Sequence, residues 1–544
     1  MLIRSCLLIC SLFGYSWYLT DRTRPEFAPG ITVTVIGSFM FLSGLANCLL
    51  VSAVLVCIAG LVLLLLQIIH KADLSVMFCF SNLLLTVACL YFLVMLYGMK
   101  LTGYDDFSHW GVVARILVTE NRFPDLTDRI LTFQAYPTGS ASVIYYFTEI
   151  SGVRAEWVWL HAQAVVILCL YISLFAFAET WRERLFLLMV FLILLCSNIF
   201  FINLLVDTEI TACAISAMCF VLYYRENLIR MRWCLLPYAV FLIAIKTSGL
   251  FYTLVFFTYA LLKGWKTEEW GKLSLILLVS FVPLVLWRLH VNAVFPEGMV
   301  TKHAFSLKYF LKTVSDKNWS GMKYIFVRLV LRTLSPRLET VYLLIFAAGL
   351  SVCFRNELKK KNSLLREAML LILLSAVAYG MMVYVMYLIS MPWYEAEQLA
   401  GFERYLHTYT AFAAGILSVV MLKIPDSEKK AIHGRMGIVL SIWVVLLLFT
   451  MGRRSDFYLR WPMERERRTY AEGLIAQSII PPEAEVLIVN NDEGEDSGYI
   501  EYMFRYLLNT PDVEVINAEE LGYNAGRNPK QCVLFWNPPD NVRR

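Results

Sequence analysis

Long apolar segments recur along most of the chain, and they constrain its fold more than any other feature. They follow one another from the N-terminus to about residue 452. A helix of about 17 to 25 apolar residues crosses ~30 Å of hydrocarbon. With 59% hydrophobic and 17% charged residues, the 544-residue chain carries more apolar side chain than a soluble fold buries. The sequence therefore predicts an all-α polytopic membrane protein, and it excludes cytosolic enzymes, disordered chains and secreted disulfide scaffolds.

Hydropathy places most of the membrane spans directly. From residue 75 onward we expect spans at 75–98, 156–177, 185–205, 208–224, 233–248, 250–265, 272–294, 337–354, 366–391, 405–423 and 436–452. The stretch 31–68 is either one long span or a hairpin around Ser43 to Asn47, so we expect 13 or 14 spans in total. The first run, Leu2 to Leu19, has no clear cleavage site after it and reads as a retained anchor.

Basic residues in short loops predict the orientation, because such loops stay in the cytoplasm. One set of alternate loops carries Arg182, Arg184, Arg225, Arg230, Arg232, Lys263, Lys266, Lys272, Arg355, Lys359, Lys360, Lys361, Arg366, Lys423, Lys429, Lys430 and Arg435. The opposite, outer side then holds the segments 99–155 and 295–336, the junctions near residues 207 and 247, the loop 392–404 and the tail from about residue 455. All candidate site residues fall on this outer side.

The chain divides into three parts. We expect N-terminal transmembrane helices over 1–74, a transmembrane module over 75–455 and a small extracytoplasmic domain over 456–544. From about Glu464 we expect a charged helix, then a strand at 485–489, a helix at about 498–508 and short strands at 513–516 and 532–536. This order predicts an α/β unit with a parallel sheet. Its acidic loop, 490–496, either binds a cation or a sugar or is simply solvated.

Cysteines and overall charge add little. Twelve of the 13 cysteines lie in or beside apolar runs, Cys532 stands alone in the tail, and no zinc-type Cys/His spacing is present. The apolar composition excludes a nucleic-acid binder, so we expect no nucleic acid among the partners, and the net charge of +5 is small for this length and says little about them.

Two adjacent carboxylates follow the span at 75–98 directly. Asp105 and Asp106 lie between Tyr104 and Phe107, close to where the span leaves the membrane. Neighbouring carboxylates near apolar surroundings repel each other, which suits a general base or a metal ligand. The alternative is an acidic cap of the helix that begins near Ser108. Two short helices are expected next, at 108–120 and 138–150, lying along the membrane surface.

Further charges mark two outer junctions between spans. Asp207 and Glu209 lie in a tight turn, where they either serve the site or cap the next helix. Lys246 interrupts an apolar run just before Thr247-Ser248-Gly249. It either snorkels to the interface or, beside the free N–H groups of a helix start, binds a phosphate.

The outer segments contribute two more candidates. His303 is either an ordinary loop histidine or a phosphate contact. Arg404 opens the helix after the loop 392–404, where it clamps a phosphate bidentately or pairs with Glu403 or Glu397.

Taken together, these residues resemble the GT-C superfamily of integral membrane glycosyltransferases, in particular bacterial cell-envelope enzymes that draw sugar from a polyprenyl-phosphate carrier. The matching segments are Tyr104-Asp105-Asp106-Phe107-Ser108-His109-Trp110, Tyr136-Pro137-Thr138-Gly139, Asp207, Ile245-Lys246-Thr247-Ser248-Gly249-Leu250 and Phe402-Glu403-Arg404-Tyr405. The resemblance covers about residues 75 to 425. Thr138 departs from the Pro that often follows Tyr-Pro in this family.

The resemblance implies an inverting sugar transfer and roles for individual residues. Asp105 would be the base that deprotonates the acceptor, with Asp106 as its partner and Asp207 orienting the acceptor or assisting the pair. The leaving lipid phosphate would be bound by Lys246, Arg404 and His303. Substrate contacts would come from His109, Trp110, Tyr136, Glu209 and Glu403. A divalent cation, Mg or Mn, would be held by Asp105 and Asp106 if the enzyme uses one.

The resemblance also implies partners and a location. The donor would be a polyprenyl-phosphate-linked sugar, hexosyl or pentosyl, and the acceptor a cell-envelope glycan or lipid. The protein would lie in the lipid bilayer of a bacterial cytoplasmic membrane with its active site outside the cytoplasm.

Three other functions stay open from the sequence. A lipid-linked oligosaccharide transporter or flippase predicts cations along a path that reaches both faces of the membrane. An O-antigen ligase or polymerase uses Arg and His in a large outer loop rather than an acidic pair. A non-catalytic assembly subunit predicts that Asp105 and Asp106 can be replaced without loss of product.

Overall fold

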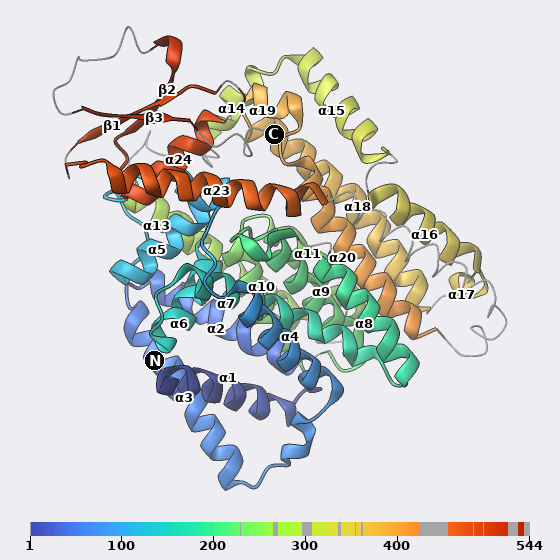
Figure 1. Cartoon of the computed structure of the whole chain (residues 1–544). Helices are drawn as coiled ribbons and strands as arrows, with labels where there is room; N and C mark the ends of the chain where they lie inside the picture. The colour runs from blue at the N-terminus through green and yellow to red at the C-terminus, as the bar shows by residue number, and fades with distance from the viewer. Residues whose placement is uncertain are drawn as a thin grey trace.

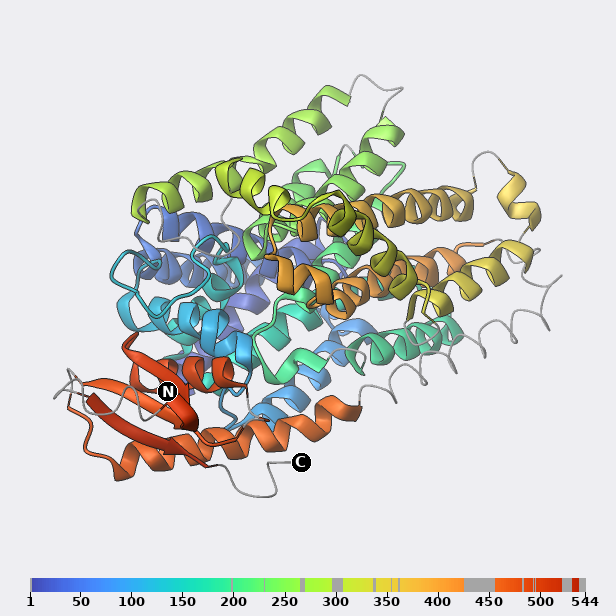
Figure 2. The same ribbon diagram turned by 90° about the horizontal axis from the view of Figure 1, so that it is seen from above.

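The chain folds into a bundle of helices with a small sheet packed at one corner (Figures 1 and 2). The computed structural model describes residues 2–537 apart from 197–198, 229, 265–269, 296–306, 336–338, 354, 361–362, 425–454, 482–483, 493, 495 and 521–530. Within these residues, seven helices are long and apolar enough to cross a membrane, and three shorter apolar helices accompany them. The predicted multi-pass α-helical membrane protein with a small α/β unit is confirmed. The predicted span 436–452 lies outside the described residues.

The N-terminal helices settle the uncertain stretch 31–68 as a hairpin. Helix α2 (Ala28–Leu45) and helix α3 (Leu49–Ile69) are joined by a tight turn in which Asn47 has a positive φ of 53°. Helix α1 (Leu2–Thr20) packs along α3. A Cβ at Gly14 would lie 2.1 Å from the carbonyl oxygen of Gly60, so glycine is what lets these two helices approach.

Most of the predicted spans between residues 75 and 423 coincide with helices to within a few residues, and further helices lie between them. Those up to residue 264 are η1 (Leu74–Met77), α4 (Phe80–Leu96), η2 (Asp106–Trp110), α5 (Gly111–Glu120), α6 (Gly139–Ser151), α7 (Glu156–Tyr171), η3 (Ile172–Phe177), α8 (Trp181–Cys196), η4 (Ile199–Ile202), α9 (Asp207–Tyr223), η5 (Arg232–Cys234), α10 (Leu235–Ile245) and α11 (Gly249–Gly264). The later ones are α12 (Trp270–Ser280), α13 (Val282–Val294), α14 (Leu307–Ser315), α15 (Trp319–Thr333), α16 (Glu339–Cys353), α17 (Arg355–Lys359), α18 (Leu364–Ile389), α19 (Trp393–Gln398) and α20 (Phe402–Leu422).

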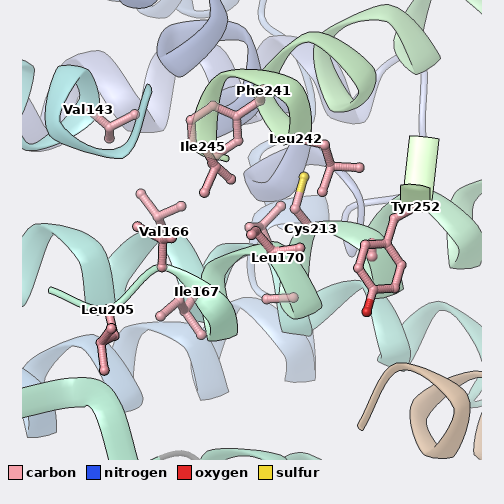
Figure 3. Packing of buried hydrophobic residues seen from close by; sticks show 14 of the residues in the cluster. Val143, Val166, Ile167, Leu170, Leu205, Cys213, Phe241, Leu242, Ile245 and Tyr252 are labelled. Atoms are coloured by element: carbon pink, nitrogen blue, oxygen red, sulfur yellow. The ribbon is translucent and has the colours of Figure 1, made fainter. Parts of the chain in front are cut away.

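Helix α9 forms the centre of the bundle. All its residues from Asp207 to Leu222 are buried, and it packs against α7, α10, α11 and α20. Small side chains along it, among them Ala212, Ala214 and Ala217, allow this close approach between helices in lipid. Figure 3 shows apolar side chains of α7, α9 and α10, such as Ile167, Cys213 and Leu242, filling the space between the three helices.

The two helices expected in the segment 99–155 are present as α5 and α6. Helix α6 is more enclosed than a surface helix, because its residues from Gly139 to Thr148 are all buried where it packs against α1, α2 and α7. Before α5, the five residues of η2 form one turn of π-helix that carries Asp106 and His109.

The C-terminal unit has the predicted α/β order. It comprises α23 (Ser455–Gln477), β1 (Glu485–Asn490), α24 (Ser497–Leu508), β2 (Val513–Asn517), η6 (Ala518–Glu520) and β3 (Gln531–Trp536). The strands lie in the order β2-β1-β3 and both pairings are parallel, with Ile488 opposite Val515 on one side and Leu534 on the other. Strand β1 is buried from Val486 onward, as expected for a central parallel strand.

Candidate active site

Four charged residues from four separate parts of the chain meet in one ion cluster. Arg404 Nη1 lies 2.6 Å from Asp105 Oδ2, and Arg404 Nε lies 3.3 Å from Asp207 Oδ2. The other oxygen of Asp207, Oδ1, accepts a hydrogen bond of 3.3 Å from Lys246 Nζ. We call these four residues the ion cluster. They are all residues that the sequence singled out, and the structure brings them together.

Local backbone geometry sets these positions at one end of the bundle. Asp207 is the first residue of α9, and Lys246 follows the last residue of α10 in extended conformation. A Cβ at Gly249 would lie 1.9 Å from the carbonyl oxygen of Leu242, so glycine is needed for α11 to begin this close to α10. Arg404 lies in the first turn of α20, which starts after Gly401 with a φ of +70°.

Exposure is graded across the ion cluster. The side chains of Asp207 and Lys246 are 7% and 12% exposed, whereas those of Arg404 and Asp105 are 25% and 34% exposed. Asp207 therefore lies at the base, and Asp105 is the carboxylate that a substrate can reach.

For Asp105 and Arg404 the structure shows contacts other than the capping and the pairing that the sequence left open, whereas Asp207 and Glu209 do lie in the first turn of α9. Within the part of the chain that the structure describes, Asp105 makes no side-chain capping hydrogen bond to η2, and no side chain caps the start of α9. Arg404 pairs with Asp105 and Asp207 instead of Glu403 or Glu397. Glu403 pairs with Arg332 at 2.9 Å and is 60% exposed.

The adjacent carboxylates Asp105 and Asp106 have different surroundings. Asp106 is fully buried, and its two oxygens accept backbone hydrogen bonds from Leu204 (2.8 Å) and Gly103 (3.2 Å). Burial, far more than the neighbouring charge of Asp105, raises the pKa of the Asp106 carboxyl well above its usual range. Asp106 thus fastens the loop that carries Asp105 to the start of α9.

The different surroundings of Asp105 and Asp106 bear on the predicted binding of a cation. Asp105 faces Arg404 while Asp106 faces backbone amides, so the pair does not form a shared ligand set for Mg or Mn. Among the described residues, no group of three or more His, Cys, Asp or Glu side chains is placed to hold a metal ion. The use of a cation stays a prediction, and a chelator tests it.

Four rings form a wall beside the ion cluster. The Tyr136 ring lies nearly parallel to those of Trp110 and Phe133, with ring centroids 5.8 and 5.5 Å away, and His109 meets all three rings edge-on. We call His109, Trp110, Phe133 and Tyr136 the aromatic box. Lys246 Nζ lies 5.9 Å from the Tyr136 ring centroid, within the range of cation–π attraction.

Two of the expected substrate contacts, Glu209 and Glu403, have other partners, and one expected phosphate contact is not described. Glu209 is buried, and it accepts hydrogen bonds from Ser140 (2.6 Å) and Gln163 (3.4 Å), which tie α6 and α7 to α9. Glu403 pairs with Arg332, as given above. His303 lies outside the described residues.

Tyr405 is a neighbour of the ion cluster that the sequence did not assign to the site. Lys246 Nζ lies 5.5 Å from its ring centroid, and its carbonyl accepts a hydrogen bond of 2.8 Å from Tyr379. Tyr405 directly follows Arg404, a charged residue in the first turn of a helix, and this is the sequence feature that could have identified it as a site residue.

The buried His109 makes the stability of this region sensitive to acid. Neither ring nitrogen has a hydrogen-bond partner among the described residues, and burial, with a smaller effect of the Lys246 ammonium, lowers the pKa of His109 to about 3. The folded state thus binds this proton less readily than the unfolded chain, whose His pKa is ~6.5. Above pH ~6.5, His109 is uncharged in both states and costs no stability. As the pH falls from ~6.5 toward 3, the unfolded chain binds this proton and the folded state does not, so the free energy of unfolding decreases.

We therefore expect His109→Phe to reduce the acid sensitivity of the protein. At about 1.4 kcal/mol per pH unit, the wild type loses about 2 kcal/mol through His109 between pH 7 and pH 5, and the variant does not. Thermal unfolding in detergent at the two pH values measures the difference. An equal loss of Tm in both proteins would show that His109 is charged in the folded state.

Comparison with known proteins gives few matches. No protein-family model matches the chain, and no curated protein matches it. The crystal structure of ArnT from Cupriavidus metallidurans bound to undecaprenyl phosphate aligns with a TM-score of 0.42 at 17% identity, over 83% of this chain and 89% of that chain. The apo structure of the same protein aligns with a TM-score of 0.45 at 16% identity over the same shares. Because both scores are low, the function proposed below rests on the residues of the site.

Proposed function

We propose that the chain is a membrane glycosyltransferase of the GT-C type that moves a sugar from a polyprenyl-phosphate donor to a hydroxyl of a cell-envelope glycan or lipid. The observation that carries the proposal is the ion cluster, in which Asp105, Asp207, Lys246 and Arg404 converge at one end of the bundle. Such a transfer needs a base for the acceptor and fixed cations for the leaving phosphate. The ion cluster contains both.

The cations of the cluster suit a phosphate that gains charge during the reaction. Lys246 and Arg404 are held by Asp207 at their base, so they are already in place when the donor arrives. The phosphate of the donor binds between them. Because it becomes more negative as the sugar leaves, these cations stabilise the transition state more than the ground state.

Asp105 is the proposed general base, since it is the more exposed of the two carboxylates in the cluster. Its carboxylate takes the proton of the acceptor hydroxyl. The acceptor oxygen then bonds to the anomeric carbon, and the bond from that carbon to the phosphate oxygen breaks with its electron pair leaving on polyprenyl phosphate. Attack from the side opposite the phosphate inverts the anomeric centre.

The aromatic box supports a sugar site next to these charges. Tyr136 is the ring of the box that lies beside Lys246, and Trp110 stacks on it. An aromatic face of this kind suits the apolar side of a sugar ring. We assign Tyr136 to the sugar contact, with Trp110 and His109 supporting its orientation.

The location of the ion cluster favours a site outside the cytoplasm. Helices α11 and α20 begin beside the cluster, and at their other ends they reach Lys263 and Lys423, which belong to the basic loops expected in the cytoplasm. A donor used on the outer face must be lipid-linked, because nucleotide sugars are cytoplasmic. We therefore place the protein in a bacterial cytoplasmic membrane with the cluster and the C-terminal unit outside.

A donor panel tests the proposal. The purified wild-type protein in detergent is incubated with polyprenyl-phosphate hexoses and pentoses and with envelope extract as acceptor, and free polyprenyl phosphate is measured with and without a chelator. We expect release from at least one donor, and loss with chelator would add a divalent cation. Donor binding without any release would contradict the transferase and favour the transporter.

A further inference from the structure

The C-terminal unit packs directly on the loop that carries Asp105. Along α24, Tyr499, Tyr502 and Tyr506 recur at a spacing of three and four residues, which places them on one helix face. The Tyr502 ring lies 5.2 Å from that of Tyr104, and the Tyr506 ring lies 5.2 Å from that of Phe107. Tyr104 and Phe107 lie directly before and after the carboxylates Asp105 and Asp106 in the chain.

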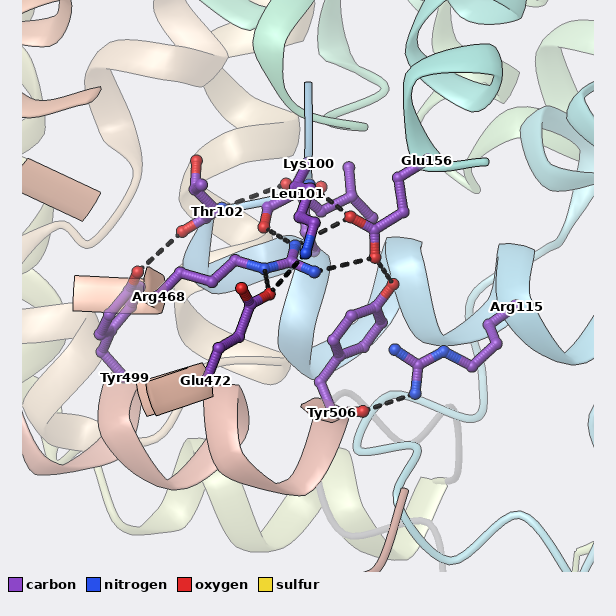
Figure 4. Close-up of polar contacts among 11 residues, drawn as sticks. Lys100, Leu101, Thr102, Arg115, Glu156, Arg468, Glu472, Tyr499 and Tyr506 are labelled. Carbon is purple, nitrogen blue, oxygen red and sulfur yellow. Dashed lines mark hydrogen bonds and ion pairs between the residues drawn. The ribbon is translucent and has the colours of Figure 1, made fainter. Parts of the chain in front are cut away.

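Hydrogen bonds fasten the start of the same loop. Glu156, the first residue of α7, accepts from the backbone N–H of Leu101 (2.8 Å), from Arg468 Nη1 (2.8 Å) and from the Tyr506 hydroxyl (2.7 Å). Arg468 also donates to the carbonyl of Leu101, and Tyr499 donates to that of Thr102 (2.9 Å). Figure 4 shows these side chains converging from α7, α23 and α24. We call Glu156, Arg468 and Tyr506 the anchor.

The anchor is largely shielded from solvent. The side chain of Arg468 is 7% exposed and that of Glu156 is 17% exposed. A buried ion pair adds little net stability over an apolar pair, but removing one partner leaves the other charge unpaired and is costly. Residues in such an arrangement serve to fix a position more than to strengthen the fold.

Asp105 lies between two attachment points. The anchor holds Leu101 on one side, and Asp106 holds the backbone of Leu204 on the other. The side chain of Asp105 then reaches Arg404 across the cluster. A shift of the loop by about 1 Å would move the base relative to the acceptor, and misplacement of that size costs on the order of 100-fold in rate.

We infer that the C-terminal unit is a positioning element for the reaction, with Arg468, Tyr506 and Glu156 as positioning residues that set the place of Asp105. The inference rests on the proposed transferase function. It assigns to the last 90 or so residues of the chain a task in catalysis, although none of the anchor residues belongs to the ion cluster.

The test uses Arg468→Gln in the full chain, with Arg505→Gln as the matched control. Arg505 lies in the same unit, but it pairs with Glu501 at 2.7 Å and with the carbonyl of Val513, both within that unit. We expect Arg468→Gln to lower kcat by about 10- to 100-fold. We expect it to bind polyprenyl phosphate with the wild-type Kd and stoichiometry, because Lys246 and Arg404 are unchanged. A loss of folded protein would instead lower the stoichiometry.

Hydrogen–deuterium exchange gives a second readout that needs no donor. Amides of residues 101–110 should exchange faster in Arg468→Gln than in the wild type, and at the wild-type rate in Arg505→Gln. Where Arg468→Gln does not fold, Tyr506→Phe and Arg468→Lys replace it, with the same direction and a smaller effect.

The outcomes separate the two proposals. A wild type that releases no polyprenyl phosphate contradicts the proposed function, and the exchange measurement then decides the positioning inference alone. An active wild type with an anchor variant of unchanged kcat overturns the positioning inference and leaves the transferase standing. Unchanged exchange over residues 101–110 also overturns it.

Discussion

Asp105→Asn should lower the release of polyprenyl phosphate by about 100- to 10,000-fold, the range expected when a general base is removed. The amide cannot take the proton of the acceptor hydroxyl. Donor binding should be equal to the wild type or tighter, because Arg404 loses a carboxylate that competes with the phosphate. Turnover at saturating donor, together with the Kd for polyprenyl phosphate, separates the two effects.

Asp125→Asn is the matched control for this variant. It makes the same change in the same outer segment, at a carboxylate that pairs with Arg122 at 3.1 Å rather than with the ion cluster. We expect wild-type turnover from it. Wild-type turnover from Asp105→Asn would remove Asp105 as the base.

Arg404→Lys should lower kcat by about 100- to 1,000-fold, comparable to the loss of one electrostatic contact to a transition state. Arginine reaches Asp105 through Nη1 and Asp207 through Nε, and a lysine ammonium cannot occupy both positions. The substitution also removes the planar guanidinium, which can donate two hydrogen bonds to the phosphate. We therefore also expect weaker binding of polyprenyl phosphate. Steady-state kinetics and a binding titration measure the two losses.

Arg332→Lys controls for the loss of a guanidinium in the same region. Arg332 lies in α15, where its side chain is 38% exposed and pairs with Glu403, the neighbour of Arg404. Its replacement should leave kcat unchanged. If Arg404→Lys retained the kcat and Kd of the wild type, the bidentate role of Arg404 would be wrong.

Most of the fold could be predicted, because hydropathy and the alternation of residues in strands can be read from short stretches of sequence. The strand expected at 485–489 is β1 at Glu485–Asn490, and the helix expected at 498–508 is α24 at Ser497–Leu508. The stretch 31–68 could not be decided, since a continuous apolar run does not reveal a turn. The turn depends on the left-handed backbone conformation of Asn47, and the apolar residues around it give no strong turn signal.

The residues of the site could be predicted better than their pairings. Arg404 and Asp105 are 299 residues apart, so nothing in the local sequence shows that they meet. Asp105 and Asp106 look equivalent in the sequence, yet the turn of π-helix that begins at Asp106 places one carboxylate in the ion cluster and the other against backbone amides.

The anchor was missed for the same reason. Arg468 and Glu156 are 312 residues apart, and each resembles an ordinary charged residue near a helix end or on a charged helix. One signal was present in the sequence: the three tyrosines on one face of α24 mark a surface that packs against another element.

Single turnover of a sugar-labelled donor tests the central claim most directly. Wild-type protein in excess over the labelled polyprenyl-phosphate sugar is mixed with acceptor and quenched over time, and the product is analysed by NMR for its anomeric configuration. We predict that the label leaves the lipid, that free polyprenyl phosphate appears at the same rate, and that the new glycoside has the inverted configuration. A label that stays on the lipid, or a product that retains the configuration of the donor, would contradict transfer by the ion cluster.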